Sequence, residues 1–288
     1  MHEKIRYFLC GFLMGIADTI PGVSGGTIAF ITGIYGKLLA TIKSADKEFF
    51  QYIFTLKLKK AFNKIPWGFA LPLLLGIGLA IGTLAHFMVI LLEKHTNIVW
   101  AFFFGLIFSS LLILLKEVKS SNPHKIISSL FFIIGAFFSI YISFANPIQL
   151  SHTYPIIFFS GFIAICAMIL PGISGAFILV LIGQYHYILE AVTTFNLPVI
   201  SLFLLGCLCG ILSFAHILSA CLNHFYHISL AFLSGILAGS LVMLFPYKGE
   251  QTITQQAILT GLIMLGILIP LVLHYIGNKM YTQKIEEK

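Results

Sequence analysis

The chain has 288 residues, of which 59% are apolar and only 9% are charged, and its formal net charge is +7. Soluble domains carry about 25% charged residues, so this composition excludes a water-soluble globular protein. The excess of Lys lies in clusters between long apolar runs, which indicates membrane orientation and argues against a nucleic-acid partner. The cysteines lie inside apolar stretches without metal-ligand spacing, so we expect no metal and no cofactor.

The first apolar segment is broken early, at Pro21 and Gly22. Two apolar arms flank the break, residues 7–20 and 27–42, and each is too short to cross about 30 Å of hydrocarbon. We therefore predict a re-entrant hairpin over residues 5–42, which returns to its own side of the membrane. A cleaved signal peptide is not expected, because a close copy of this region reappears in mid-chain.

A Lys-rich insert over residues 43–64 follows the hairpin, and its charge predicts a cytoplasmic position. Three apolar segments come next, each long enough, or nearly so, to cross the membrane. They are the predicted transmembrane helices 67–92, 98–115 and 126–145. Together with the hairpin and the insert they form a predicted first repeat over residues 1–145.

The second part of the chain repeats the first. With a shift of 150 the identical pairs are Pro21/Pro171, Gly22/Gly172, Ser24/Ser174, Gly25/Gly175, Ile28/Ile178, Gly33/Gly183 and Tyr35/Tyr185. With a shift of 130 they include Gly76/Gly206, Ala85/Ala215, His86/His216, Phe102/Phe232, Gly105/Gly235 and Ser110/Ser240. Apolar residues match by chance, but runs of Pro, Gly, Ser and His do not. We interpret the match as an internal duplication.

The predicted second repeat covers residues 154–278. It consists of a hairpin and three helices, 154–192, 198–222, 228–246 and 254–277, before a tail at 279–288. Three crossings per half is an odd number, so the second half is expected to run upside down. The expected fold is an all-α polytopic membrane protein, an inverted repeat of two halves, each a re-entrant helical hairpin plus three transmembrane helices. Both termini are then cytoplasmic, as the positive-inside rule favours.

Each hairpin tip carries Pro-Gly-x-Ser-Gly. The helix-breaking residues are Pro21, Gly22, Pro171 and Gly172. Backbone groups opened at membrane depth must be buried or line a wet cavity. The second arm of each hairpin begins with N–H groups and a positive dipole end that suit a phosphate or carboxylate. The predicted phosphate-binding residues are Ser24, Gly25, Gly26, Thr27, Ser174 and Gly175. The alternative is that Pro-Gly merely kinks two packed helices.

Ionisable residues at membrane depth are expensive and often functional. Asp18 lies near the first tip, where the second half has Met168, and is a candidate for proton handling or for pairing with tip N–H groups. Arg6 is a candidate phosphate contact at the cytoplasmic mouth, or a topology anchor. Lys37 and Glu190 lie near the open ends of the second arms. Lys37 is a further phosphate candidate and Glu190 a coupling candidate, with an interfacial position as the alternative for both.

His86 and His216 occupy matching places in the repeat. A pair of His suits a proton-linked gate because imidazole titrates near neutral pH, although a His near an interface is often only hydrogen-bonded there. The Gly-x-Ser-x-Gly pattern at Ser24 is also found in hydrolases, but their nucleophile needs a preceding strand. We therefore expect no enzymatic activity.

The run from Gly15 to Phe30, with its echo at residues 171–175, resembles the PopT family of polyprenyl-phosphate translocases. The resemblance covers essentially the whole chain, and the Asp-x-x-Pro-Gly-x-Ser-Gly-Gly run is distinctive. It implies a protein of the bacterial cytoplasmic (inner) membrane that returns undecaprenyl phosphate from the outer to the inner leaflet for cell-envelope synthesis, with this lipid and other membrane lipids as partners. Ala176 replaces Gly26 in the second motif, where phosphate seating is expected to differ.

Two other functions stay open from the residues themselves. One is a secondary transporter of a small anion or organic acid, which the same anion-binding tips would serve. The other is a structural or assembly factor without transport, which would tolerate loss of both tip serines. Uptake of a soluble anion by the purified protein, or an unchanged phenotype without Ser24 and Ser174, would discriminate these functions from lipid translocation.

Overall fold

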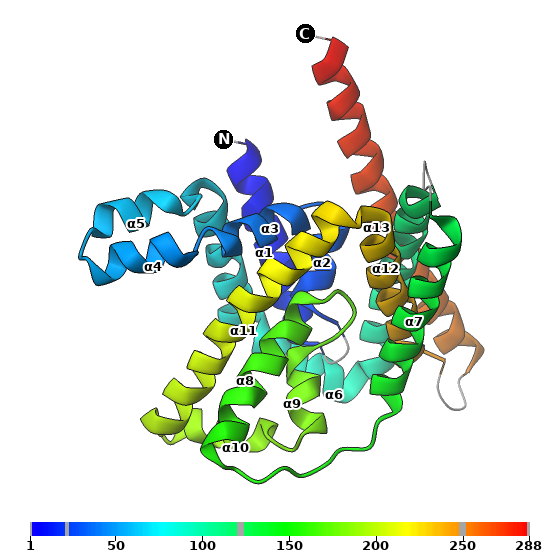
Figure 1. The fold of residues 1–288 in the computed structure, drawn as a ribbon. Helices are drawn as coiled ribbons and strands as arrows, with labels where there is room; N and C mark the ends of the chain where they lie inside the picture. The colour runs from blue at the N-terminus through cyan, green and yellow to red at the C-terminus, as the bar shows by residue number, and fades with distance from the viewer. Residues whose placement is uncertain (1, 21–22, 120–123, 248–251, 287–288) are drawn as a thin grey trace. The chain divides into compact units, whose positions relative to one another are not determined.

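The computed structural model describes residues 2–20, 23–119, 124–247 and 252–286, and the regular elements within these ranges are α-helices (Figure 1). In chain order they are α1 (His2–Asp18), α2 (Gly25–Ile31), α3 (Tyr35–Lys43), α4 (Lys47–Phe54), α5 (Leu58–Lys64), α6 (Trp67–Lys119), α7 (Lys125–Phe144), α8 (Tyr154–Ile169), α9 (Gly175–Leu181), α10 (Tyr185–Thr193), α11 (Leu197–His224), α12 (Tyr226–Met243) and α13 (Ile253–Glu286).

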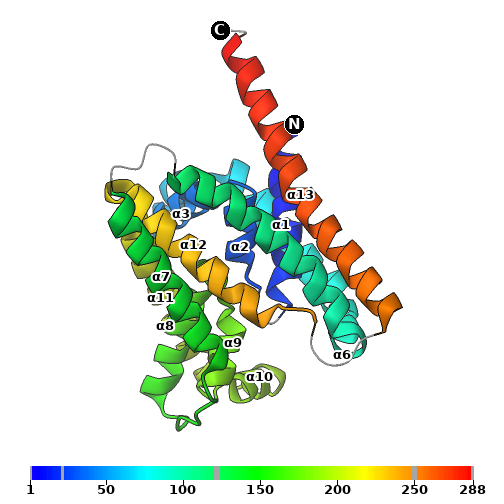
Figure 2. The ribbon, with the colours of Figure 1, turned by 90° about the vertical axis from the view of Figure 1, so that its right-hand side faces the viewer.

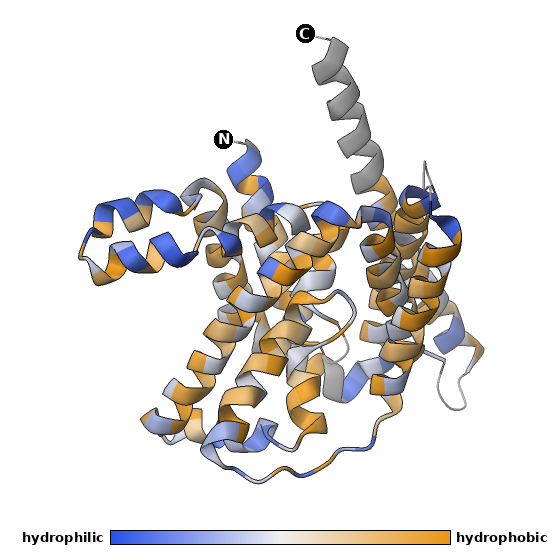
Figure 3. Cartoon of the chain, in the orientation of Figure 1, coloured by the Kyte–Doolittle hydropathy of each residue, from blue (hydrophilic) through white to orange (hydrophobic). Residues whose placement is uncertain are grey.

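Six helical segments in the described part of the chain are long and apolar enough to cross a membrane, or up to eight if each of two bent helix pairs is one span. The six are Trp67–Leu84, Lys94–Lys119, Lys125–Phe144, Leu197–His224, Tyr226–Met243 and Ile253–Val272. Figure 3 shows these helices largely in the apolar colour, whereas polar residues gather on α4 and α5. The prediction of an all-α polytopic membrane protein is therefore confirmed.

The chain forms two compact units, and each takes segments from both sequence halves. Unit 1 contains residues 1–86 and 144–226, and unit 2 contains residues 87–143 and 227–288. Helix α6 contributes to both, and it covers the two segments 67–92 and 98–115 that the sequence predicts as separate helices. A kink at His95, which has φ −139° and ψ 41°, separates the two segments within α6.

A kink with similar backbone angles is found at the matching position of the second half. Phe225 separates α11 from α12 and has φ −130° and ψ 50°, close to the values at His95. The two positions differ by the shift of 130 that relates the halves in sequence. Matching backbone geometry at matching positions supports the duplication.

The second arm of each hairpin is not one helix, and the expectation of a single arm over residues 27–42 is wrong. Helix α2 ends at Ile31, and α3 leaves it at an angle of 119°, while α9 and α10 meet at 110°. Gly33 has a φ of +72°, and the N–H groups of this residue and the next donate back to α2 carbonyl oxygens at 3.2 and 3.0 Å. This is the Schellman ending that glycine favours. Gly183, with a φ of +71°, ends α9 in the same way.

Glycines let the paired helices of unit 1 touch through their backbones. A methyl group added at Gly11 of α1 would collide with the Leu73 carbonyl of α6, and one added at Gly161 of α8 would collide with the Phe203 carbonyl of α11. Gly161 and Phe203 are the repeat counterparts of Gly11 and Leu73. Each half therefore packs its first helix on the start of its first long helix by the same small-residue contact.

Unit 2 exchanges helices between the halves. Gly135 of α7 lies against Phe232 of α12, and Gly266 of α13 lies against Phe102 of α6, each so closely that a methyl group would not fit. Phe102 and Phe232 are repeat counterparts, so Gly135 and Gly266 hold equivalent places. Figure 2 shows the result, with α7 beside α12 and α6 beside α13. The third helix of each half thus packs on the second long helix of the other half.

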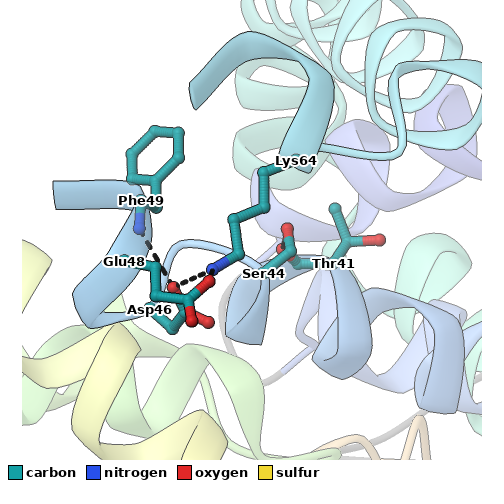
Figure 4. A network of polar contacts seen from close by, with 6 residues as sticks. All are labelled: Thr41, Ser44, Asp46, Glu48, Phe49 and Lys64. Atoms are coloured by element: carbon teal, nitrogen blue, oxygen red, sulfur yellow. Dashed lines mark hydrogen bonds and ion pairs between the residues drawn. The ribbon is translucent and has the colours of Figure 1, made fainter. Parts of the chain in front are cut away.

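Helices α4 and α5 form a polar arm over the predicted insert. The Asp46 carboxylate caps α4 by accepting from the Phe49 N–H at 3.0 Å, and the Lys64 ammonium contacts both Asp46 and Glu48 (Figure 4). The Lys64 hydrogen bond, followed by that of the backbone N–H, lowers the pKa of the Asp46 carboxyl below its ordinary value. The arm joins the start of α6, where Phe62 stacks on Trp67 at 4.7 Å between ring centroids.

Candidate functional site

The two hairpin tips lie together in unit 1. In Figure 1, α1 starts at the top and α8 starts at the bottom, so the two hairpins extend in opposite directions and their tips meet inside the unit. Helix α2 also packs against α8. Pro21 and Gly22 fall outside the described residues. Their counterparts Pro171 and Gly172 are buried, and Gly172 has a φ of +90°, a conformation that glycine adopts without steric cost.

The first tip satisfies its own helix N-terminus. Ser24 is the N-cap of α2, and its hydroxyl accepts from the Gly26 N–H at 3.0 Å. The Asp18 carboxylate, at the end of α1, accepts from the Gly25 N–H at 2.6 Å. A carboxylate therefore holds the position where the sequence analysis places a phosphate, as expected from the dipole of a helix N-terminus. Of the two roles predicted for Asp18, pairing with tip N–H groups is the one observed.

Among the described residues, three hydrogen bonds join the first hairpin to the second. The Ser24 hydroxyl donates to the Met168 carbonyl at 2.7 Å, and the Tyr35 hydroxyl donates to the Ile169 carbonyl at 3.1 Å. In the reverse direction the Gly172 N–H donates to the Thr27 hydroxyl at 2.8 Å. Each bond satisfies a backbone group that the second tip opens at the end of α8, where water is scarce and an unmade bond is costly.

Gly26 is needed for this contact. A methyl group at Gly26 would lie 2.5 Å from the Ile169 carbonyl oxygen and 2.8 Å from that of Met168, which is too close. Its counterpart Ala176 is exposed, so a side chain there meets no such restriction. The difference between the two motifs therefore follows from packing, because the end of α8 lies against the start of α2.

The second tip has a weaker set of local contacts. Ser174 is the N-cap of α9, and its hydroxyl accepts from the Phe177 N–H at 3.5 Å, a long bond. Met168 stands where the first half has Asp18, so this helix start has no carboxylate from the matching position. Gly175 lies against the Ala164 carbonyl of its own hairpin. The two tips thus share a serine N-cap but differ in charge.

Arg6 and Lys37 secure the bend of the first hairpin. The Arg6 guanidinium donates to the Thr32 carbonyl at 2.9 Å, at the end of α2. The Lys37 ammonium donates to the Tyr7 hydroxyl at 2.6 Å and lies 4.5 Å from the centre of the Tyr7 ring. Both cations tie α1 to the α2–α3 bend, a structural role that the sequence analysis did not foresee. Cations are favourable at a helix C-terminus, as Arg6 shows here.

The second bend is secured by backbone instead. The segment before α8 runs across this bend. The Leu150 N–H donates at 3.3 Å to the carbonyl oxygen of Ile182, which is the repeat counterpart of Thr32. The buried Gln184 donates to the Leu150 carbonyl at 2.9 Å and lies 3.1 Å from a ring nitrogen of His152. Sequence reasoning missed Gln184 and His152. The only available signal was a polar residue directly after the repeated Gly183.

The remaining candidates stand apart from the tips. His216 is exposed on α11, and its Nδ1 lies 2.7 Å from the Leu212 carbonyl of its own helix. The side chain of His86 is not among those described, so the proposed His pair stays a prediction. Glu190 is exposed on α10, beyond the second bend. In the described part of the chain no group of three His, Cys, Asp or Glu could hold a metal ion.

The chain is similar to known proteins over most of its length. A family model described as undecaprenyl phosphate translocase-like matches residues 14–268. A polyprenyl-phosphate transporter of Vibrio cholerae is 44% identical over 84% of this chain and 77% of its own length. A polyprenyl-phosphate transporter of Staphylococcus aureus is 31% identical over 83% of this chain and 85% of its own length. No solved structure matches the chain.

Proposed function

Because the chain belongs to the undecaprenyl phosphate translocase-like family, we propose that it moves undecaprenyl phosphate from the outer to the inner leaflet of the bacterial cytoplasmic membrane. The observation that carries the proposal is the meeting of two hairpin tips in unit 1, from opposite ends, through three hydrogen bonds. Irregular backbone at membrane depth, buried between helices, is typical of transporter substrate sites. The role is transport and not catalysis.

The proposed topology is the inverted repeat of residues 1–145 and 154–278, with both termini in the cytoplasm. The opposite directions of α1 and α8 in Figure 1 support it, since equivalent helices of inverted repeats run in opposite directions. The distribution of Lys supports it too. Residues 37–64 contain seven Lys, Lys37 and Lys64 included, next to the predicted cytoplasmic side of the first hairpin.

The proposed translocation step is an exchange of anions at the first tip. A phosphate that approaches the start of α2 meets the same Gly25 N–H that the Asp18 carboxylate now accepts from. Two anions are not favoured at one helix start, so the phosphate must displace Asp18, and protonation of that carboxyl removes the competition. Loss of the proton after passage would restore the carboxylate and expel the phosphate, so turnover needs both protonation states of Asp18, and their exchange would couple phosphate passage to the pH on one side.

The tips must also separate for a headgroup to pass. The three hydrogen bonds between them are few enough to be exchanged for bonds to phosphate oxygens. The donors for this exchange are the Ser24 and Tyr35 hydroxyls and the Gly172 N–H. The backbone contacts between α1 and α6, and between α8 and α11, would hold each hairpin to its own half as the halves move.

A strain that depends on this protein tests the coupling role. Asp18→Asn keeps an oxygen that accepts from the Gly25 N–H but removes the charge and the proton exchange. We expect undecaprenyl phosphate to accumulate in the outer leaflet, measured by labelling of surface-exposed lipid. Glu48→Gln, at an exposed carboxylate of the α4–α5 arm, is the matched control and should behave as wild type. A wild-type lipid distribution in the Asp18→Asn strain would refute the exchange.

A further inference from the structure

A cavity in unit 2 lies outside the site described above. Its volume is about 500 Å³, within the range of small-molecule sites. It lies between the end of α6 and the start of α7, with one residue from α12. Its lining residues are Leu115, Val118, Lys119, Lys125, Ser128, Ser129, Phe132, Ile133 and Ala231.

The polar groups of this cavity have the chemistry of a phosphate site. Lys119 is the last residue of α6 and Lys125 is the first of α7, so two Lys from two helix ends line the cavity, and their side chains are long enough for the ammonium groups to meet an anion there. Two hydroxyls, of Ser128 and Ser129, come from the first turn of α7 and the residue after it. A phosphate monoester carries about −1.5 to −2 charges at neutral pH, which two Lys can neutralise. The start of the 20-residue α7 adds a favourable dipole.

The rest of the cavity is apolar and continues along the membrane-spanning part of α7. Phe132 and Ile133 lie one turn below the serines, and Ile133 is 61% exposed, so the cavity is open to the lipid beside α7. Phe137, one further turn along, is 68% exposed. A lipid with its headgroup between the lysines would therefore find an apolar path for its chain.

Part of the polar lining, Lys125 and Ser128, is not repeated in the second half. Gly135 and Gly266 hold equivalent places in α7 and α13, which pairs Lys125 with Gln256 and Ser128 with Leu259. The second half thus lacks the charge at one of these positions and the hydroxyl at the other, whereas Ser129 is matched by Thr260, which keeps a hydroxyl. A feature present in only one half is not explained by helix packing, because the packing is duplicated.

We propose that this cavity binds the headgroup of a phosphate-headed lipid, with the apolar chain lying along α7. The inference rests on the proposed function, in which polyprenyl phosphate is delivered to the cytoplasmic leaflet. The Lys-rich end of unit 2 belongs to that leaflet by the positive-inside rule. The cavity then holds the lipid after translocation, as a site separate from the hairpin tips. The same chemistry would also accept an anionic phospholipid, and the two sources are distinguished below.

Photocrosslinking locates the lipid on the intact protein. The purified full chain in nanodiscs receives a diazirine-bearing undecaprenyl phosphate, and adducts are mapped by peptide mass spectrometry. We expect adducts on residues 125–137, lost at least tenfold in Lys119→Gln/Lys125→Gln. The double variant Lys59→Gln/Lys60→Gln removes the same charge from the α4–α5 arm and should keep them. Equal loss in both variants, or no adduct on this segment in the wild type, would overturn the proposal.

Competition separates the two sources of phosphate. Unlabelled undecaprenyl phosphate should suppress the adducts at concentrations at which phosphatidylglycerol, a diester with one charge, does not. Equal competition by phosphatidylglycerol would assign the cavity to bulk anionic lipid and contradict delivery of the carrier. Adducts from the uncharged polyprenol analogue, at the level of the phosphate, would contradict headgroup binding itself.

Transport measured on the same preparations keeps the two proposals distinct. If wild-type protein moves no polyprenyl phosphate in vesicles, the proposed function fails, whatever the crosslinks show. If the wild type transports and the Lys119→Gln/Lys125→Gln variant crosslinks as well as wild type, only the cavity assignment fails. Lys116→Gln, one turn from Lys119 and outside the lining, should leave both measurements unchanged.

Discussion

Thr27 supplies a side-chain acceptor that the first hairpin offers to the backbone of the second tip, since its hydroxyl accepts from the buried Gly172 N–H at 2.8 Å. Thr27→Val keeps the shape of the side chain and removes the acceptor, which leaves a buried N–H without a partner. We expect a loss of about 1–3 kcal/mol in unfolding free energy, measured as a lower Tm in detergent, together with slower transport.

A matched variant separates this contact from the change of residue type. The Thr83 hydroxyl donates to the Leu79 carbonyl of its own helix and is exposed, so Thr83→Val breaks no contact between the hairpins. Its Tm should stay close to that of the wild type. If Thr27→Val and Thr83→Val lowered the Tm equally, the hydrogen bond between Thr27 and Gly172 would not stabilise the folded protein more than a hydrogen bond within one helix.

The sequence marks Asp18 as a functional candidate but does not determine which contact its carboxylate makes. Its place before Pro21 and its absence from the second half mark it as a functional candidate. The Gly25 N–H that it accepts from is seven residues away, on the far side of a chain reversal, so the choice between its roles depends on the shape of the tip. Ser24 and Met168 are 144 residues apart, and no local pattern predicts their contact.

The repeated bend is the element-scale feature with the clearest test. Gly33 and Gly183 have φ values of +72° and +71°, where an L-residue costs about 1–2 kcal/mol. Space around Gly33 is open, but a methyl group at Gly183 would lie 2.8 Å from the Ile148 carbonyl oxygen. Gly183→Ala should therefore lower the Tm more than Gly33→Ala. Equal decreases in Tm for the two variants would show that the segment before α8, which contains Ile148, moves away from the added methyl group without a loss of stability.

The α4–α5 arm should respond to pH through Asp46. Its pKa is lowered in the folded arm by Lys64, so the ionised carboxylate stabilises the arm at neutral pH. Since the unfolded arm binds the proton more tightly, this stabilisation declines below the ordinary pKa of Asp and is lost as the pH falls through the lowered value. Fluorescence of Trp67, stacked on Phe62, should report the loss in a Trp100→Phe background.

Two variants of the arm check the assignment. Asp46→Asn should remove the acid transition, because no group with a lowered pKa then remains at the α4 cap. Glu48→Gln removes the second and more exposed Lys64 contact and should leave most of the transition in place. A transition that persists in Asp46→Asn would show that another group controls the arm.

Among the helices, the sequence predicts the membrane-spanning segments better than the bends between short helices. Length and hydropathy locate the apolar helices, and the charge of the insert separates it from them. The bend after α2 was missed because residues 27–36 are largely apolar and the turn there depends on long-range packing. The identical pair Gly33/Gly183 contained the signal, since a glycine repeated in both halves often marks a positive φ.

At the scale of the whole molecule, duplication accounts for much of the fold. Paired glycine contacts recur at matching positions in both units, and the kinks at His95 and Phe225 have nearly the same backbone angles. The sequence does not reveal that α7 packs on α12 and α13 on α6, because helix exchange between halves leaves the hydropathy pattern unchanged. The duplicated scaffold carries unequal chemistry, with Asp18 and Lys125 on the first half alone.

We propose that this protein transfers a phosphate-headed polyprenyl lipid between leaflets through hairpin tips that Asp18 controls. Leaflet-resolved labelling of undecaprenyl phosphate in reconstituted vesicles tests it most directly, with and without a pH gradient. We expect label to be lost from one leaflet in vesicles with wild-type protein, at a rate that changes with the gradient, and little loss with Asp18→Asn. Transfer no faster than in protein-free vesicles would contradict it.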